Sequence, residues 1–217
     1  MKHAVLSLAF VTAAASAAHA DVLSLRAEAH AGGGVGKTLS GAVQDNGRGG
    51  FYDNADGAAW GFLVGVEALF VDAWIEHHEF MGDGRAVNGT WTQFMAGMDL
   101  DLDFGQERGP APANGKQGEL GPPTKYLELG IGFGYGVGTG QQVDLPLDNS
   151  EVSDKGFVIE GRFSAGIVVA RVIGIGITVP VSAGYFFKNG FANDMDNQYW
   201  SAQGAVMLVV RGKIKIK

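Results

Sequence analysis

The chain has 217 residues, a net charge of −7 and no cysteine. An acidic chain is a poor partner for nucleic acid, because phosphate contacts need clustered Lys and Arg. Without cysteine there is neither a disulfide framework nor a lipid-anchored cysteine after an export signal. Glycine is the unusual component: the chain has 35 glycines, where average usage is about 7%, and many of them alternate with apolar residues.

Residues 1–20 are predicted to be a signal peptide. A short basic start precedes an apolar run, and the segment ends in Ala18-His19-Ala20, the small-x-small sequence that signal peptidase recognises. The apolar run is shorter than the roughly twenty residues that a membrane-spanning helix needs. We therefore expect export, with residues 21–217 as the mature domain.

Period-two alternation of apolar with polar or small residues dominates the mature domain. This period indicates β-strands, because successive strand side chains point to opposite faces. Each segment is long enough for the roughly nine to eleven residues that a tilted membrane strand needs. The expected strands cover residues 23–35, 60–70, 71–81, 92–104, 126–139, 157–170, 173–187 and 200–217.

The first four expected strands carry charges on their polar faces. Leucine and alanine alternate with Arg26 and Glu28 in the first strand, and Glu67 lies on the polar face of the second. In the fourth strand, apolar residues alternate with three aspartates. Residues 71–81 favour neither register, so we expect a strand there only from its position between two turns.

The last four expected strands show the alternation more clearly. The fifth alternates leucine, isoleucine and aromatic residues with Glu128 and a run of glycines, and the sixth carries Glu160 and Arg162 on its polar face. The seventh alternates isoleucine and valine with glycine, serine and threonine. The eighth carries Arg211 opposite a face of valine, leucine and isoleucine.

The connections between the expected strands alternate in length. Two of them, near residues 70 and 171, are very short, and the linker at residues 105–123 is rich in proline and glycine. Long loops on one side and tight turns on the other are typical of outer-membrane barrels; the linker is an exception, which we interpret as a tolerated insertion. The long, polar connections cover residues 38–57, 82–89, 140–156 and 189–198.

The pattern predicts an all-β, eight-stranded, antiparallel up-and-down transmembrane β-barrel. A charge that faces hydrocarbon near the bilayer centre costs about 2–4 kcal/mol for Arg or Lys, so we expect the apolar face outside and the charges in the lumen. Aromatic residues near strand ends suit interfacial girdles, and the glycines make room in a narrow lumen. Buried charges must pair, so Arg26, Arg162 and Arg211 are expected to pair with Glu28, Glu67, Glu128 and Glu160.

These features together resemble small outer-membrane barrel proteins of the OmpA/OmpW type, which belong to the Gram-negative cell envelope. The resemblance covers essentially the whole mature chain and is architectural. It implies a barrel that is anchored by outer-membrane lipid. One feature departs from the pattern: such barrels usually end on an aromatic residue, whereas this chain ends in Lys213-Ile214-Lys215-Ile216-Lys217.

Three local motifs resemble binding sites, but their sequence context does not support that function. Residues 31–38 satisfy a relaxed phosphate-loop pattern, and Gly130 to Gly134 suggest a dinucleotide loop, but no helix follows either segment. His77 and His78 are adjacent in an expected strand, so their side chains point to opposite faces and cannot easily share one ion. We therefore predict no catalytic residue, no cofactor and no metal site.

A structural or interaction barrel is the leading functional hypothesis. It would be a monomer with a closed, ion-paired lumen, and its acidic loops at 38–57, 140–156 and 189–198 would meet an extracellular ligand or protein. Alternatives are a narrow pore for small or hydrophobic solutes, a lipid-modifying enzyme, and a soluble secreted barrel that binds an apolar ligand.

Overall fold

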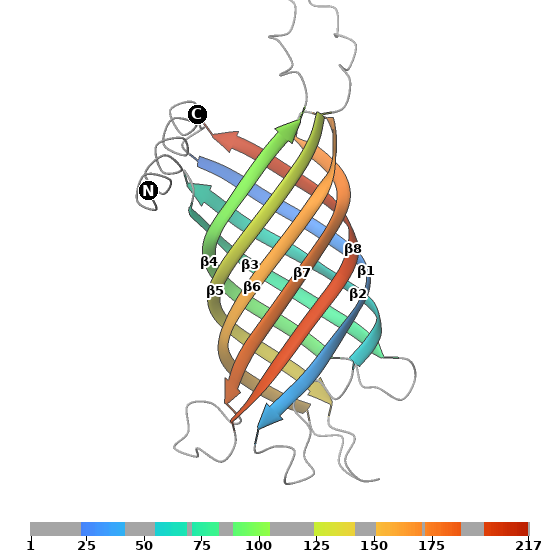
Figure 1. Cartoon of the computed structure of the whole chain (residues 1–217), viewed down its shortest axis with the longest axis vertical. Coiled ribbons are helices and arrows are strands. Elements are labelled where there is room, and N and C mark those ends of the chain that lie inside the picture. Colours follow the sequence, from blue (N-terminus) through green and yellow to red (C-terminus); the bar gives the residue numbers. More distant parts are fainter. Residues whose placement is uncertain are drawn as a thin grey trace, which may run out of the picture.

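Eight strands close into one antiparallel barrel, in which each strand pairs with its neighbours in sequence and β1 pairs with β8 (Figure 1). The computed structural model describes residues 23–41, 55–68, 71–82, 89–104, 124–141, 151–170, 172–187 and 198–216. The strands are β1 (Leu23–Gly41), β2 (Ala55–Ala68), β3 (Val71–Gly82), β4 (Gly89–Phe104), β5 (Thr124–Gln141), β6 (Glu151–Ala170), β7 (Ile173–Phe187) and β8 (Gln198–Ile216).

The eight-stranded barrel confirms the predicted fold class. Closure runs along β1 and β8 from the pair Leu23–Ile216 to the pair Gly41–Tyr199, with one register shift between Thr38 and Ser40. Among the described residues, no helix is long and apolar enough to cross a membrane. The predicted signal peptide and the linker at residues 105–123 lie outside the described residues.

The strand ends define two ends of the barrel. At the loop end, connections of six residues or more join β1 to β2, β3 to β4, β5 to β6 and β7 to β8. At the turn end, two residues join β2 to β3, and two join β6 to β7. The long and short connections therefore alternate as predicted, with the linker at residues 105–123 also at the turn end. The strands are longer than predicted, because residues 38–41, 55–57 and 151–156, which the sequence assigned to loops, belong to β1, β2 and β6.

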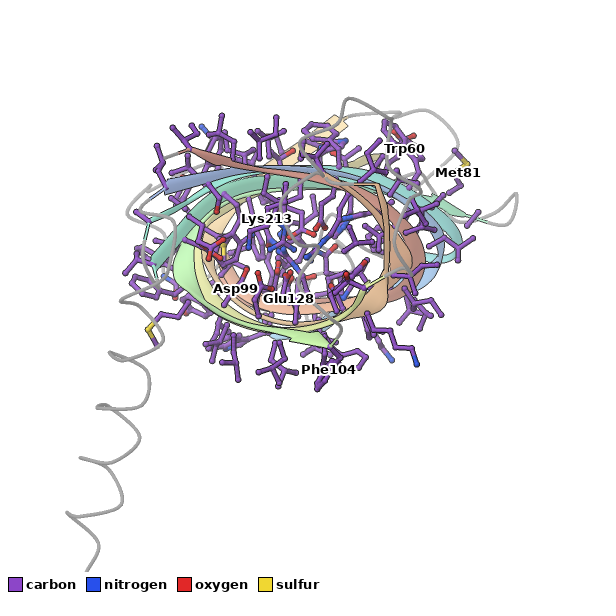
Figure 2. The ribbon with its side chains drawn as sticks, turned by 90° about the horizontal axis from the view of Figure 1, so that it is seen from above. Trp60, Met81, Asp99, Phe104, Glu128 and Lys213 are labelled. Carbon is purple, nitrogen blue, oxygen red and sulfur yellow. The ribbon has the colours of Figure 1, made fainter. Side chains whose placement is uncertain are left out.

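The outer face of the wall is apolar, and the inner face combines charged and polar side chains with a cluster of buried apolar ones. Figure 2 looks down the barrel and shows Asp99, Glu128 and Lys213 inside the ring, with Trp60, Met81 and Phe104 outside. This arrangement is the reverse of the one that a soluble barrel needs. Outward-facing, exposed side chains include Leu25, Phe62, Ile75, Phe94, Ile131, Phe163, Ile177 and Leu208. Buried inward-facing side chains include Arg26, Glu28, His30, Asp72, Glu76, Gln93, Glu128, Glu160, Arg162, Ser182, Gln203 and Arg211.

Strand β3, whose register the sequence left open, places Trp74, Glu76 and His78 inside the barrel, where they are buried. The indole of Trp74 needs the space that small residues leave opposite it. A Cβ on Gly132 would collide with that indole, and a Cβ on Gly97 would lie 2.9 Å from its Cη2 atom. Glycines on the inner wall therefore make room for a larger side chain.

Aromatic side chains form a row around the outer face near the loop end. The row follows cross-strand pairs through five adjacent strands: Phe94 with Tyr135, Tyr135 with Phe157, Phe157 with Tyr185, and Tyr185 with Trp200. The ring centroids of Tyr185 and Trp200 are 5.2 Å apart. A row of this kind suits a membrane interface, where amphipathic rings lie at the level of the lipid headgroups.

Candidate functional site in the barrel lumen

Side chains in the lumen form three layers, which follow from their positions along the strands. The aromatic layer, Phe80, Trp91, Phe186 and Tyr199, lies towards the loop end. The central cluster, Glu76, Gln93, Glu160 and Arg162, lies at mid-strand. The turn-end cluster lies towards the opposite mouth and consists of Arg26, Glu67, Asp99, Asp101, Glu128, Arg211 and Lys213.

The aromatic layer closes the lumen below the loops. Trp91 and Phe186 meet edge to face with ring centroids 4.9 Å apart, and Phe186 stacks on Tyr199 at 5.9 Å. The Tyr199 hydroxyl donates a hydrogen bond to Asp154 Oδ2 at 2.6 Å. Trp91, Phe186 and Tyr199 are each 0–1% exposed, so these rings are packed against other groups on all sides.

The central cluster is a network of buried charges. Arg162 Nη2 lies 2.9 Å from Glu76 Oε2 and 2.5 Å from Glu160 Oε1. The side-chain amide of Gln93 donates to Glu76 at 2.9 Å and also to Glu160. Trp91 Nε1 donates to Gln93 Oε1 at 2.9 Å. The indole thus ties the aromatic layer to the central cluster, and three strands, β3, β4 and β6, contribute to one network.

The turn-end cluster is organised around Arg26. Its guanidinium lies 2.7 Å from both Glu28 and Asp99 and 2.5 Å from Glu128. Arg211 Nη1 lies 2.6 Å from Glu128 Oε2. One carboxylate, Glu128, therefore joins two guanidinium groups that come from β1 and β8.

Three further contacts complete the packing of the charged groups. Nearer the mouth, Lys213 Nζ pairs with Glu67 at 2.5 Å and with Asp101. The Arg211 guanidinium lies 3.8 Å from the centroid of the Tyr126 ring, a cation–π contact. The Tyr126 ring thus covers a face of the Arg211 guanidinium that Glu128 does not reach.

All seven residues that the sequence proposed for lumen ion pairs lie on the inner wall. The structure brings Arg26 to Glu28 and Glu128, Arg162 to Glu160, and Arg211 to Glu128. Among the described residues, Glu67 pairs with Lys213 and not with an arginine.

Sequence reasoning missed Glu76 and His78, because β3 lacks clear alternation. A signal for them does exist in the chain. The two-residue connection to β2 pairs Glu67 with Asp72, and directly paired residues share a face. Since Glu67 was assigned to the lumen, Asp72, Glu76 and His78 follow at even spacing along β3.

Negative charge exceeds positive charge on the described inner wall. The acids are nine: Glu28, Glu67, Asp72, Glu76, Asp99, Asp101, Glu128, Asp154 and Glu160. The Arg and Lys side chains are four: Arg26, Arg162, Arg211 and Lys213. Counted as fully ionised, nine acids against four bases give a formal excess of five negative charges. Buried charge of one sign is costly, and either protonation of carboxyl groups or a bound cation would relieve it.

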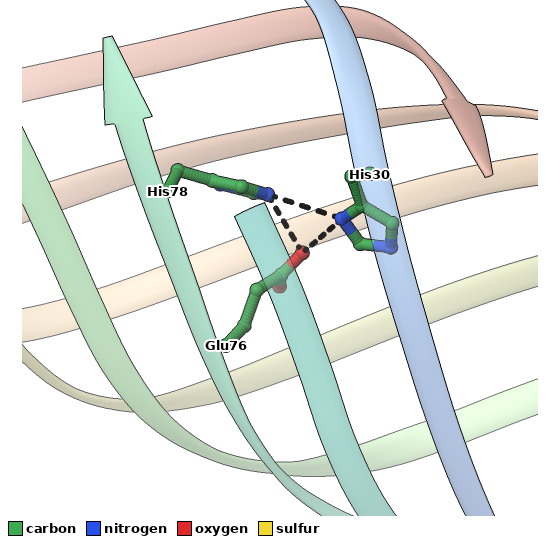
Figure 3. Close-up of side chains that lie close together, drawn as sticks. All are labelled: His30, Glu76 and His78. Carbon is green, nitrogen blue, oxygen red and sulfur yellow. Dashed lines mark hydrogen bonds and ion pairs between the residues drawn. The ribbon is translucent and has the colours of Figure 1, made fainter. Parts of the chain in front are cut away.

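Glu76 of the central cluster and two histidines beside it point their ligand atoms at one another (Figure 3). His30 Nδ1, Glu76 Oε1 and His78 Nε2 come from β1 and β3 and lie within 4.8 Å of one another. All three residues are buried. Two imidazoles and a carboxylate are a ligand set that can hold a transition-metal ion.

The other motifs that the sequence raised are ordinary strand in the structure. Residues 31–38 lie within β1, and Gly130 to Gly134 lie within β5, so neither segment forms a phosphate-binding loop. His77 and His78 do point to opposite faces: His77 lies on the outer face, where its Nδ1 is 2.8 Å from Thr92 Oγ1. The central parts of the loops expected to meet a partner lie outside the described residues.

No protein-family model matches the chain, and no curated protein matches it in sequence. Among solved structures, the chain is similar to Neisserial surface protein A (NspA), with 10% identity, a TM-score of 0.47, and coverage of 88% of this chain and 97% of that one. It is also similar to the outer membrane protease OmpT from Escherichia coli, with 7% identity, a TM-score of 0.41 and the same coverage. The predicted resemblance to small outer-membrane barrels is confirmed at the level of the fold by the closed barrel of eight antiparallel strands.

Proposed function

We propose that this protein is an outer-membrane β-barrel with a closed lumen, and that it acts as a structural or interaction protein rather than as an enzyme. The apolar outer face supports a location in lipid. Exposed side chains such as Phe133 and Leu208 form part of a continuous apolar surface, which is favourable against hydrocarbon and unfavourable in water. The aromatic row near the loop end supports an orientation with that end at one interface.

The main support for a closed barrel is that side chains fill the lumen. Eight strands enclose a space only just wide enough for side chains. Here the aromatic layer occupies that space above the central cluster, in which Glu76 and Glu160 are 0–1% exposed. A water-filled channel would expose these carboxylates. Their ion pairs with Arg162 instead tie the strands together across the barrel.

The proposed interaction surface is the set of long loops around residues 38–57, 140–156 and 189–198. A barrel without a channel and without a catalytic role offers the outside of the cell mainly its loops. The predicted signal peptide would deliver the chain to the envelope. The partner is an extracellular ligand or protein that meets an acidic, Asn- and Asp-rich surface, and the barrel itself is a monomer.

Planar-bilayer recording tests the closed lumen. The refolded protein is expected to give no step currents, whereas a general porin in the same bilayers gives them. The double variant Trp91→Ala with Phe186→Ala removes two rings of the aromatic layer and is the matched opening control. Discrete currents from the unaltered protein would contradict the proposal, and cation-selective currents would point to the pore alternative, given the acidic lumen.

Membrane fractionation with surface proteolysis tests location and orientation. The protein is expected in the outer-membrane fraction, with heat-modifiable migration on gels. Protease added to intact cells should cut within residues 42–54, 142–150 or 188–197, while the two short turns stay intact. Recovery of the protein in a soluble fraction would refute the membrane assignment.

A further inference from the structure

The triad of His30, Glu76 and His78 has the dimensions of a metal site. His30 Nδ1 lies 3.5 Å from His78 Nε2 and 4.0 Å from Glu76 Oε1, and His78 Nε2 lies 3.2 Å from Glu76 Oε1. A triangle with these sides has one point about 2.1 Å from all three atoms, which matches the Zn–N and Zn–O bond lengths of about 2.0–2.2 Å. An ion therefore fits between the three side chains without any rearrangement of the wall.

The three facing atoms of the triad include more hydrogen-bond acceptors than N–H donors when both imidazoles are neutral. The carboxylate of Glu28 lies 2.9 Å from His30 Nε2, which places the proton of a neutral His30 ring on Nε2 and leaves a lone pair on Nδ1. Glu76 Oε1 is buried and has no hydrogen-bond partner among the described atoms, although His78 Nε2 is close to it. A single N–H on His78 Nε2 cannot donate to both His30 Nδ1 and Glu76 Oε1. A metal cation, in contrast, can bind these two atoms and His78 Nε2 together.

The surroundings of the triad are those of a supported ligand set. A carboxylate behind a ligating histidine fixes the ring and raises its basicity, and Glu28 occupies that place behind His30. Glu28 is held in turn by Arg26 at 2.7 Å. The second oxygen of Glu76 is fixed by Arg162 and Gln93, each at 2.9 Å. His30 and Glu76 are thus oriented by their hydrogen bonds and ion pairs before any ion arrives, and the His78 ring packs edge-on against Phe80.

We propose that the lumen contains a binding site for one divalent transition-metal ion, with His30, Glu76 and His78 as its protein ligands and Zn²⁺ as the best-fitting ion. Two imidazoles and one carboxylate suit Zn²⁺ in tetrahedral coordination and leave a fourth position for water. In the formal count of charges on the inner wall, the ion reduces the negative excess from five to three. It also joins β1 to β3, two strands that are not hydrogen-bonded neighbours.

Metal titration of the refolded protein tests the site. Zn²⁺ alone is added either before refolding in detergent or after it, since buried apolar side chains surround the loop-end side of the triad, and binding is measured by competition with a chromophoric chelator. We expect one ion per chain in at least one of the two samples, and a tetrahedral visible spectrum when Co²⁺ replaces Zn²⁺.

Matched variants decide whether the bound ion lies in the triad. Glu28→Gln removes the carboxylate behind His30 and is expected to weaken binding about 10–100-fold, while His30→Gln and His78→Gln should weaken it more. His77→Gln is the control, because it removes the neighbouring histidine from the outer face of the same strand and should leave affinity unchanged. Folding of each variant is checked by heat-modifiable migration.

Two results would overturn the proposal. One is the absence of bound ion in both samples of the unaltered protein, which would make the triad a purely hydrogen-bonded group. The other is binding that survives His30→Gln and His78→Gln or is lost in His77→Gln. If the inner variants do not fold, electron paramagnetic resonance of Cu²⁺ in the unaltered protein decides: nitrogen couplings from two imidazoles support the site, and their absence refutes it.

Discussion

The two faces of the barrel wall follow different rules. On the outer face a side chain needs only to be apolar: Phe133 is 72% exposed and Leu208 is 67% exposed, and hydrocarbon accepts many shapes. On the inner face a side chain needs particular partners, as Glu76 shows with contacts to Gln93, His78 and Arg162. The class of a residue therefore determines the outer face, whereas individual contacts determine the inner one.

Removal of a buried cation should have the largest effect on stability. Arg162→Met leaves Glu76 and Glu160 without their shared guanidinium, and loss of one partner from a buried ion pair costs about 3–5 kcal/mol. Lys155→Met changes an exposed cation on the same strand and should stay within about 0.5 kcal/mol. Urea unfolding in lipid vesicles measures both. Equal losses of unfolding free energy in the two variants would contradict the distinction between the inner and outer faces.

A charge placed on the outer face should cause the next largest loss of stability. Leu208→Arg puts a guanidinium near the middle of β8, and the expected cost is about 2–4 kcal/mol near the bilayer centre. Leu39→Arg makes the same change near the loop end of β1 and should cost no more than about 1 kcal/mol, because the penalty falls towards the interface. The same unfolding assay applies. A cost that does not depend on depth would refute the membrane-spanning arrangement.

This contrast explains what the sequence could predict. Alternation reports the class of each residue, so it predicted the strands, the outward apolar face and the inward position of residues such as Glu128 and Arg162. The alternation did not assign a register to residues 71–81. His77 and Glu79 lie on the outer face near the loop end, where polar groups are tolerated, so the two faces of this strand do not differ clearly in sequence.

Contacts between inner side chains are harder to predict, because they depend on how strands are staggered around the closed barrel. Arg26 meets Asp99, which is 73 residues away along the chain, and no spacing in the sequence encodes that pair. His30 and His78 belong to strands that are not neighbours in the sheet, and they meet only across the lumen. Alternation therefore assigned residues to the lumen but did not predict the triad.

Two glycines offer a smaller test of the same contrast. A Cβ on Gly132 would collide with the rigid indole of Trp74, so Gly132→Ala should cost about 1–3 kcal/mol through overpacking. Gly161 lies on the outer face of β6 with nothing within 4 Å of its Cβ position, and Gly161→Ala should be neutral within about 0.5 kcal/mol. Tryptophan fluorescence during urea unfolding follows both variants. A neutral Gly132→Ala would show that the indole can move aside.

A change of shape without a change of polarity should have the smallest effect and should separate the faces most directly. Phe80 is 1% exposed and its ring lies edge-on to that of His78, so Phe80→Leu is expected to cost about 1 kcal/mol through imperfect repacking. Phe133→Leu makes the same substitution on the outer face, where lipid fills the space that the ring leaves, and should be neutral within about 0.5 kcal/mol. The two variants are compared by their urea midpoints in the same vesicles. If Phe133→Leu is the more damaging of the two, the outer face also depends on fitted contacts, as an interface with a second protein would.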